Sequence, residues 1–284
     1  MNIIKNKDIA AVIVTHNPGK EFVQVFDRIK NQTDHVIVVD NNSRNSRKVT
    51  LKAKKVTVIR NKRNYGIGKA LNQGVSKASK AKYKWVLLLD QDTLVDKDVI
   101  RKMICVLNDC SLKKNIGILS SNSRSKLSGK LAIKSNNSKA KCFEIKTAIT
   151  SGSLLSISSF KKTGCFREDY FIEGVDLEYC LRLRKNGFKV FSTTEPLMTH
   201  AAGKMREVNV FGRKILVTDH KPSRYYYMAR NLKKIIYEYY YREPLWVIVA
   251  LMNTGKMLTK VILFEKSKLK KFHNVFRGAF VAGE

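Results

Sequence analysis

Short apolar runs separated by amphipathic stretches constrain the fold of this chain more than any other feature. The runs 9–14, 35–39, 56–59 and 85–89 each end at a polar turn. Continuous apolar runs are typical of strands covered on both faces. The stretch 22–29 between the first two runs places its apolar residues at helical spacing. Strands that alternate with helices predict a parallel sheet with right-handed crossovers, so we expect an α/β fold.

The last of these runs stops at two carboxylates, Asp90 and Asp92, which lie two positions apart. In an extended segment such side chains leave on the same side, so both can offer oxygens to one hard cation. Open α/β sheets bind ligands at this carboxyl edge of their strands. An acidic turn that merely follows a strand is the ordinary alternative, and these residues alone do not decide between the two.

Composition limits the partners that such a fold would meet. The chain of 284 residues is 44% hydrophobic and 27% charged, as a globular protein is, and is long enough for one large domain or a domain with an appendage. The 55 Lys and Arg residues outnumber 23 Asp and Glu residues, for a net charge of +32. This excess predicts a polyanionic partner or surface: nucleic acid, acidic lipid or a phosphorylated substrate.

Cysteine usage and apolar segments bear on the compartment. The five cysteines form no C-x-x-C pair, which favours reduced thiols in a cytosolic protein. No signal peptide is visible before the first strand. The apolar segment 245–251 is followed by Asn253, Lys256 and Lys260. We therefore expect this segment to be too short and too charged to span a bilayer.

The second half of the chain is less regular. The stretch 120–141 is rich in Ser, Asn and Lys, which predicts a loop or a weak hairpin. Residues from about 220 onward are rich in aromatics and Lys. We expect strands at 147–157 and 188–191 and helices at 176–185, 225–241 and 245–264.

The order of the motifs resembles the nucleotide-sugar half of the family 2 glycosyltransferases. The motifs are T-H-N-P, V-V-D-N-N-S, N-x-R-N-x-G-x-G-x-A-x-N-x-G and L-L-L-D-Q-D-T. The segment 170–182 extends the resemblance into the acceptor half. H-K-P-S-R-Y-Y-Y-M-A-R-N at 220–231 is similar to a segment of bacterial rhamnosyltransferases of cell-surface polysaccharide assembly. The resemblance covers residues 9–231 and implies a GT-A fold, inversion and dependence on a divalent metal.

The resemblance also implies a division of the chain. The catalytic domain would comprise residues 1–218, with a nucleotide-sugar half at about 1–118 and an acceptor half at about 119–218. Residues 219–284 would form a basic, aromatic-rich helical region.

Site residues follow from the same resemblance. Asp92 would hold Mg²⁺ or Mn²⁺, with Asp90 beside it or acting through the ribose, and His200 would complete the metal site or touch the diphosphate. His220 and Arg224 could bind the diphosphate of the donor or of a lipid-linked acceptor, unless they belong to a solvated basic helix face. The other expected nucleotide-binding residues are Thr15, His16, Asn17, Asp40, Arg63, Asn64 and Gly66, of which the last three could also form an ordinary turn.

Inversion requires a base opposite the leaving group, and Asp176 is the candidate. It aligns with the second residue of the family's Glu-Asp motif and opens a predicted helix, where an ionised carboxylate is favoured. An N-cap role is the structural alternative. Val175 departs from the usual Glu, so Glu173 or Glu178 could hold part of the role.

The C-terminal region carries an apolar stripe bordered by Lys, which fits an interfacial helix on an anionic leaflet. It equally fits a helix that docks on its own domain or on a second subunit in a homodimer. We expect a protein in the cytoplasm, peripheral on the inner face of the membrane, that does not bind nucleic acid. The stripe consists of Trp246, Val249, Ala250, Met257, Val261 and Phe264.

Three functions compete at this stage. The first is transfer of L-rhamnose from dTDP-rhamnose to a polyprenyl-diphosphate-linked precursor of a cell-surface polysaccharide. The second keeps the fold but uses a UDP-sugar donor of galactofuranose or another hexose. The third is nucleic-acid binding, which the charge alone motivates.

Overall fold

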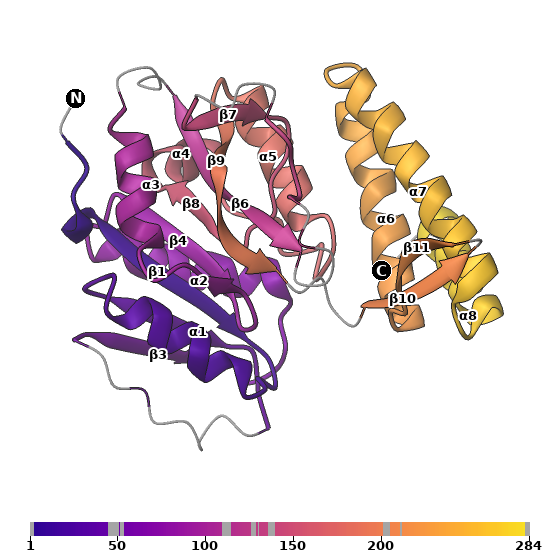
Figure 1. Ribbon diagram of the computed structural model, residues 1–284, viewed down its shortest axis with the longest axis horizontal. Helices are drawn as coiled ribbons and strands as arrows, with labels where there is room; N and C mark the ends of the chain where they lie inside the picture. The colour runs from indigo at the N-terminus through magenta and orange to yellow at the C-terminus, as the bar shows by residue number, and fades with distance from the viewer. Residues whose placement is uncertain are drawn as a thin grey trace. The chain divides into compact units, whose positions relative to one another are not determined.

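The chain folds into two compact units. Unit 1 comprises Met1–Phe171 and Val175–His200, and unit 2 comprises Ile172–Gly174 and Ala201–Glu284. The computed structural model in Figure 1 describes residues 3–44, 51, 54–109, 115–125, 129, 131–135, 140–200, 205–210 and 212–281.

Four parallel strands form the first half of the sheet in unit 1, in the order β3-β2-β1-β4. All residues of β1 and β2 are buried, as the continuous apolar runs predict. Cα pairing sets Thr15 beside Asp40 and Val14 beside Asp90, so the polar strand ends share one edge. The strands are β1 (Ile9–Thr15), β2 (Val36–Asp40), β3 (Val56–Arg60) and β4 (Trp85–Asp90).

The second half of the sheet is mixed. In the described part of the chain the sheet has nine strands, in the order β3-β2-β1-β4-β8-β6-β9-β5, with β7 paired to β9. Strand β8 is antiparallel to both β4 and β6, whereas β6 and β9 are parallel. These strands are β5 (Leu94–Val95), β6 (Ile116–Ser125), β7 (Cys142–Ile145), β8 (Ser153–Ser156) and β9 (Lys189–His200).

Helices flank this sheet (Figure 1). The apolar face of α1, with Phe22, Val25 and Ile29, packs into a core shared with β1, β2 and β4. Asp8, in a short 3-10 helix at Asn6–Asp8, forms an ion pair with Lys84. The helices of unit 1 are α1 (Glu21–Lys30), α2 (Ile67–Lys80), α3 (Val99–Leu107), α4 (Ile157–Thr163) and α5 (Val175–Lys185).

The predicted loop at 120–141 is partly wrong, because β6 continues through its polar start. Ser120, Ser121 and Asn122 are buried although they are polar. Asn122 donates its side-chain amide to Ile133 O at 2.8 Å and receives support from Thr193, whose Oγ1 accepts from Asn122 N at 3.0 Å. Polar residues can enter a buried strand when tertiary partners satisfy them, and periodicity does not reveal such partners.

The described residues of unit 2 form a two-stranded ribbon and three helices. Helices α6 and α7 match the predicted helices, whereas the ribbon and α8 were not anticipated. Figure 1 shows the three helices side by side, and a Cβ at Gly278 of α8 would lie 2.3 Å from Tyr226 O of α6. The elements are β10 (Met205–Val210), β11 (Arg213–Thr218), α6 (Pro222–Tyr239), α7 (Pro244–Phe264) and α8 (Lys268–Phe280).

The interior of unit 2 is charged. Lys271 is 2% exposed, and its Nζ lies 2.7 Å from Glu265 Oε2 and also pairs with Asp219. Tyr225 OH donates to the same Glu265 oxygen at 2.6 Å. These contacts link α6, α8 and the turn before α8. A buried charge is costly without its partner, so these elements are held together.

Helix α7 corrects the expectation that its apolar segment is too short to span a bilayer. The helix has 21 residues, and by length and composition alone it is apolar enough to cross a membrane. Only 11% of its most apolar 18-residue window is buried. Asn253, Lys256 and Lys260 do not end the helix, so the apolar segment is longer than 245–251.

Candidate active site

Several of the residues predicted to bind the sugar-nucleotide donor lie at the carboxyl edge of the parallel strands. Thr15 Oγ1 donates to Asp40 Oδ1 at 3.0 Å, and His16 Nδ1 lies 2.9 Å from Asn41 O. The turn after β1 is thereby fastened to the end of β2. Asn17 joins the same network, since its backbone N–H donates to Ser43 Oγ at 2.7 Å.

Asp40 is more enclosed than the sequence suggested. It is 5% exposed, and its carboxylate accepts from Thr15, from Ser43 Oγ and from Ser43 N at 3.2 Å. Asp40 therefore holds two turns in place. The remaining lone pairs of its carboxylate can accept hydrogen bonds from a ligand. A cavity of about 290 Å³ opens beside it, lined by Thr15, Pro18, Phe22, Val38, Asp40, Leu51, Val56, Val58 and Arg60.

Beyond the end of β4, two further carboxylates influence Asp90 electrostatically. Burial, followed by the charges of Asp92 and Asp176, raises the pKa of Asp90 to about 7. Asp176 comes from the first turn of α5, far along the chain, so the fold unites the motif after β4 with the predicted base. The fold therefore brings two like charges close enough to act on Asp90.

Neighbouring side chains hold this acidic turn. Asp90 N donates to Ser151 Oγ at 2.8 Å, and Ser151 Oγ donates to the buried Thr93 Oγ1 at 2.7 Å. Gln91 Oε1 accepts from His16 N at 2.8 Å, which connects the turn after β4 to the turn after β1. Gln91 and Ser151 were not singled out in the sequence. Gln91 lies between the two acids of the motif and could have been, whereas Ser151 had no comparable signal.

The residues present fit a divalent cation. Asp90 and Asp92 carry carboxylate oxygens, which Mg²⁺ and Mn²⁺ prefer, and burial, followed by the charges of Asp92 and Asp176, raises the pKa of Asp90, so a cation there would favour its ionised form. Among the described side chains, no group of three or more His, Cys, Asp or Glu is arranged as a complete metal site. His200 ends β9, but its side chain lies outside the described set.

The loop with Arg63, Asn64 and Gly66 is tied to the end of β2 by an amide network. Asn41 Nδ2 donates to Asn64 Oδ1 at 2.9 Å and to Gly66 O at 3.0 Å. Asn61 Nδ2 donates to Asn41 Oδ1 at 3.0 Å. Arg63 itself is exposed, with its guanidinium carbon 5.0 Å from the centroid of the Tyr65 ring. Hydrogen bonds from the end of β2 therefore hold this loop in place, and its part in nucleotide binding stays a prediction.

Helix α5 begins at Val175, so Asp176 lies in its first turn and is not the N-cap residue. Its Oδ1 accepts from Leu177 N at 2.9 Å. Glu178 is fully buried and receives Arg182 Nε at 2.7 Å, so its carboxylate has a structural partner. Of the acids near this helix start, Asp176 is the one whose charge reaches Asp90.

His220 and Arg224 belong to unit 2, together with Glu173. Arg224 Nε donates to Glu173 Oε1 at 2.6 Å, and Arg224 Nη1 lies 3.3 Å from His220 Nδ1. Burial, then the charge of Arg224, lowers the pKa of His220. The guanidinium of Arg224 therefore already has a carboxylate partner, which the sequence did not indicate.

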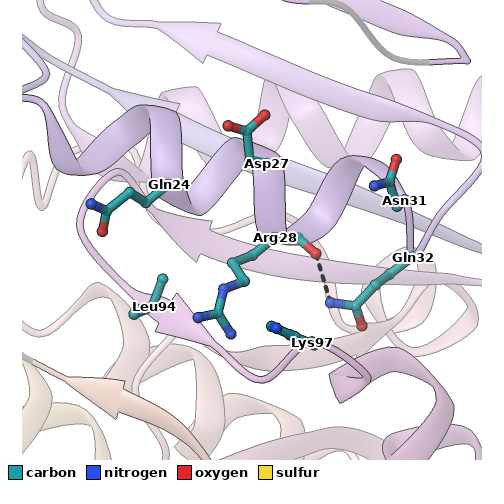
Figure 2. Close-up of a pocket in the computed structure, with 7 residues that line it drawn as sticks. All are labelled: Gln24, Asp27, Arg28, Asn31, Gln32, Leu94 and Lys97. Atoms are coloured by element: carbon teal, nitrogen blue, oxygen red, sulfur yellow. Dashed lines mark hydrogen bonds between the residues drawn. The ribbon is translucent and has the colours of Figure 1, made fainter.

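A second depression, of about 470 Å³, lies between α1 and the β5 segment (Figure 2). Gln32 Nε2 donates to Arg28 O at 2.7 Å at its wall. None of the predicted donor, metal or base residues lines it, so it is not the candidate site. Its lining consists of Gln24, Asp27, Arg28, Asn31, Gln32, Leu94 and Lys97.

Known proteins share this architecture and its motifs. The profile of glycosyl transferase family 2 matches residues 10–164, more than half of the chain. The dTDP-rhamnosyl transferase RfbF of Shigella flexneri is 32% identical over 240 residues, which cover 80% of this chain and 79% of that protein.

Solved structures agree at the level of the fold. A crystal structure of S. aureus TarS matches 91% of this chain at 14% identity with a TM-score of 0.56, and the match spans 44% of that longer chain. The crystal structure of TarS 1-349 matches 95% of this chain and 79% of that one, at 14% identity and a TM-score of 0.58.

The predicted α/β fold of the GT-A type is confirmed by the sheet and by these neighbours. The predicted enzyme class is confirmed by the family profile and by the relative. This chain belongs to glycosyltransferase family 2 and is a glycosyltransferase related to rhamnosyltransferases.

Proposed function

We propose that this enzyme transfers L-rhamnose from dTDP-rhamnose, with inversion, to a lipid-linked precursor of a cell-surface polysaccharide. The electrostatic influence of Asp92 and Asp176 on the buried Asp90 carries the proposal, because such a group of acids would suit both metal-assisted diphosphate binding and a base. The name of the Shigella flexneri relative supports the choice of sugar and nucleotide.

The donor would lie along the carboxyl edge of β1, β2 and β4. The cavity beside Asp40 has apolar walls from Phe22, Val38 and Val56 and polar groups on Thr15 and Asp40, a combination that suits a pyrimidine base. The diphosphate would then lie toward the turn after β4, where the acids are.

Asp90 and Asp92 would hold the divalent ion near that diphosphate. When bound, the ion supplies Lewis-acid stabilisation of the negative charge that grows on the leaving diphosphate. Ser151, Thr93 and Gln91 keep the acidic turn in one conformation, so the ligands are positioned before the substrate arrives.

Asp176 would act as the general base. Its carboxylate takes the proton from the acceptor hydroxyl as that oxygen forms a bond to the anomeric carbon from the face opposite the leaving group. The bond between the anomeric carbon and the phosphate oxygen breaks, and its electron pair leaves with dTDP. The position of Asp176 at the start of α5 favours the ionised form that this step needs.

A panel of sugar nucleotides tests this function. Transfer or slow hydrolysis of dTDP-rhamnose in the presence of Mn²⁺, with loss of activity in EDTA and recovery on adding the metal back, is the expected result. Preference for a UDP-hexose or UDP-galactofuranose would replace the donor and keep the mechanism. No turnover of any sugar nucleotide, together with a shift of RNA in a gel at physiological salt, would contradict the proposal.

The acceptor proposal extends to an anionic membrane surface that unit 2 would bind. Leu245, Ile248, Val249 and Met252 of α7 follow the i, i+3, i+4, i+7 spacing of one helix face, and each is between 53% and 69% exposed. Lys266, Lys268 and Lys270 are exposed around Leu269, which is 87% exposed. Apolar side chains bordered by Lys suit the headgroup boundary of an acidic leaflet, at the inner face of the cell membrane.

Co-sedimentation with vesicles tests this surface. The enzyme is expected to bind phosphatidylcholine vesicles only when they contain phosphatidylglycerol, and to lose binding when Leu245, Val249 and Met252 are changed to Ser. Val23→Ser on α1, which removes an apolar side chain that is 47% exposed in unit 1, is the control. A stable dimer in light scattering that the triple variant dissociates, without vesicle binding, would assign the surface to a second copy instead.

A further inference from the structure

The start of α2 lies against the backbone of another segment, and its glycines are shaped for that contact. A Cβ at Gly66 would lie 2.5 Å from Phe171 O, and one at Gly68 would lie 2.4 Å from Arg167 O. Both distances are too short for a Cβ atom, so only glycine fits at these two positions without a shift of the backbone. The close approach that the sequence assigned to the nucleotide is therefore, at these two positions, an approach to the protein's own backbone.

Hydrogen bonds hold the same contact together. The N–H of Ile67, which has no acceptor within its own helix because it lies at the helix start, donates to Phe171 O at 2.6 Å. Asn72 binds the backbone of Phe166 in both directions: Nδ2 donates to Phe166 O and Oδ1 accepts from Phe166 N, each at 2.9 Å. Asn72 Nδ2 also lies 3.0 Å from Glu168 Oε1. We call this contact of Gly66, Gly68 and Asn72 with residues 166–171 the α2 seam.

The seam ends next to the candidate base. Phe171, whose carbonyl is held by Ile67, is followed closely along the chain by Asp176. Phe171 has φ of 53°, a left-handed conformation that is unfavourable for a bulky side chain. Such a conformation persists only where neighbouring contacts impose it, and the Ile67 hydrogen bond is one of these.

The other side of α2 is joined to the donor edge. Asn41 directly follows Asp40 at the end of β2, and it binds both Asn64 and the carbonyl of Gly66. A continuous path of short polar contacts therefore runs from the donor edge, through the loop before α2, to the segment that leads into Asp176.

Asn72 has the features of a residue that sets a position. It is 6% exposed, and in the described part of the chain its side chain hydrogen-bonds to residues 166–168 and not within its own helix. An apolar residue would fill the same space without fixing a register. The paired bonds with Phe166 instead fix where that backbone lies to within hydrogen-bond tolerance.

We propose that Asn72 is a positioning residue for the transfer step and that the α2 seam places Asp176 relative to the bound donor. This proposal rests on the proposed role of Asp176 as the base. The seam contributes nothing to donor affinity by direct contact, because its groups are occupied by the protein's own backbone. Its loss misplaces the base, and a misplacement of about 1 Å costs on the order of 10²-fold in rate.

Steady-state kinetics and donor binding of Asn72→Ala and Gly68→Ala test the proposal, with Gly255→Ala as the control. Gly255 lies in α7 with nothing within 4 Å of a built Cβ, so alanine there is harmless or helpful to the helix. Gly68→Ala would also favour its helix were the seam absent. We expect kcat to fall at least about tenfold in both seam variants, with dTDP-rhamnose affinity within about twofold of wild type.

A compensating pair separates positioning from general damage. Asn72→Asp loses the donor to Phe166 and repels Glu168, whereas adding Glu168→Gln supplies a donor to the new carboxylate. The double variant is expected to recover part of the lost kcat. If Asn72→Ala does not fold, Gly68→Ala and this pair still give the answer.

Each outcome is decisive. Unchanged kcat in both seam variants, or a loss confined to donor affinity, would overturn the seam proposal while Asp176→Asn stays inactive. Full transfer by Asp176→Asn would overturn the base role, and with it the seam proposal. A fall in kcat for Gly255→Ala equal to that of Gly68→Ala would also overturn it.

Discussion

The two units of this enzyme use polar side chains in opposite ways. In unit 1 the strands β1 and β2 are fully buried, and polar residues gather at their carboxyl edge, where Asp40, Asn41 and Gln91 hydrogen-bond to the turn after β1. In unit 2 the interior holds the Lys271–Glu265 ion pair, while α7 leaves apolar side chains exposed. The same kinds of residue therefore form a reaction site in one unit and a helix scaffold in the other.

The difference teaches where function can be located from chemistry. A charge cluster marks a site only when its charges are not compensated. Burial, followed by the charges of Asp92 and Asp176, raises the pKa of Asp90 to about 7, whereas the buried Lys271 lies against two carboxylates. We accordingly propose that unit 1 holds the reaction site and that the surface of unit 2 meets a partner.

The largest expected effect separates the site from the scaffold. Asp176→Asn should reduce transfer by about 10²–10⁴-fold, because it removes the proton acceptor and keeps the size of the side chain. Donor affinity, measured by calorimetry with dTDP-rhamnose and Mn²⁺, should change little. Loss of donor binding would instead make Asp176 part of the metal or diphosphate site.

The next effect tests whether unit 2 is a scaffold in its own right. Lys271→Met leaves Glu265 buried without its cation, which should destabilise the helices by about 3–5 kcal/mol. Hydrogen exchange should accelerate in α6 and α8 and leave β1 and β4 protected. Lys189→Met removes an exposed partner of Glu144 and should cost less than about 1 kcal/mol. Equal acceleration in the sheet and the helices would contradict the contrast.

The smallest effect concerns pH. Burial, followed by Lys55 and Lys77, lowers the pKa of His35 below 6.5, and its Nδ1 is buried without a hydrogen-bond partner among the described atoms. Below pH 6.5 the unfolded chain therefore binds a proton that the folded one refuses, so stability falls as pH falls.

Urea titrations between pH 7 and pH 5 measure this dependence. The slope from His35 is at most about 1.4 kcal/mol per pH unit. His35→Gln, which cannot titrate, should flatten the curve in unit 1. His220 in unit 2 has a pKa lowered in the same direction, so the helices should retain their own dependence. A steeper curve in His35→Gln would contradict this account.

Apolar periodicity determined the parallel half of the sheet. The strands β1, β2 and β4 follow from the sequence because their burial requires continuous apolar runs, and strand ends at one edge follow from parallel topology. The same reasoning placed Asp90 beside Asp92. It failed for β6 and α8, since Ser120, Asn122 and Lys271 are buried by partners distant in sequence.

The sequence by itself determined the family, the α/β sheet and the group of acids at its edge, because these depend on local spacing and motif order. The tertiary structure decided which charged groups influence one another. It brought the charge of Asp176 to bear on Asp90 and paired Arg224 with Glu173. It also turned Gly66 and Gly68 toward the backbone of residues 166–171. Contacts between distant segments depend on packing that no local pattern encodes, and for that reason the sequence alone did not predict them.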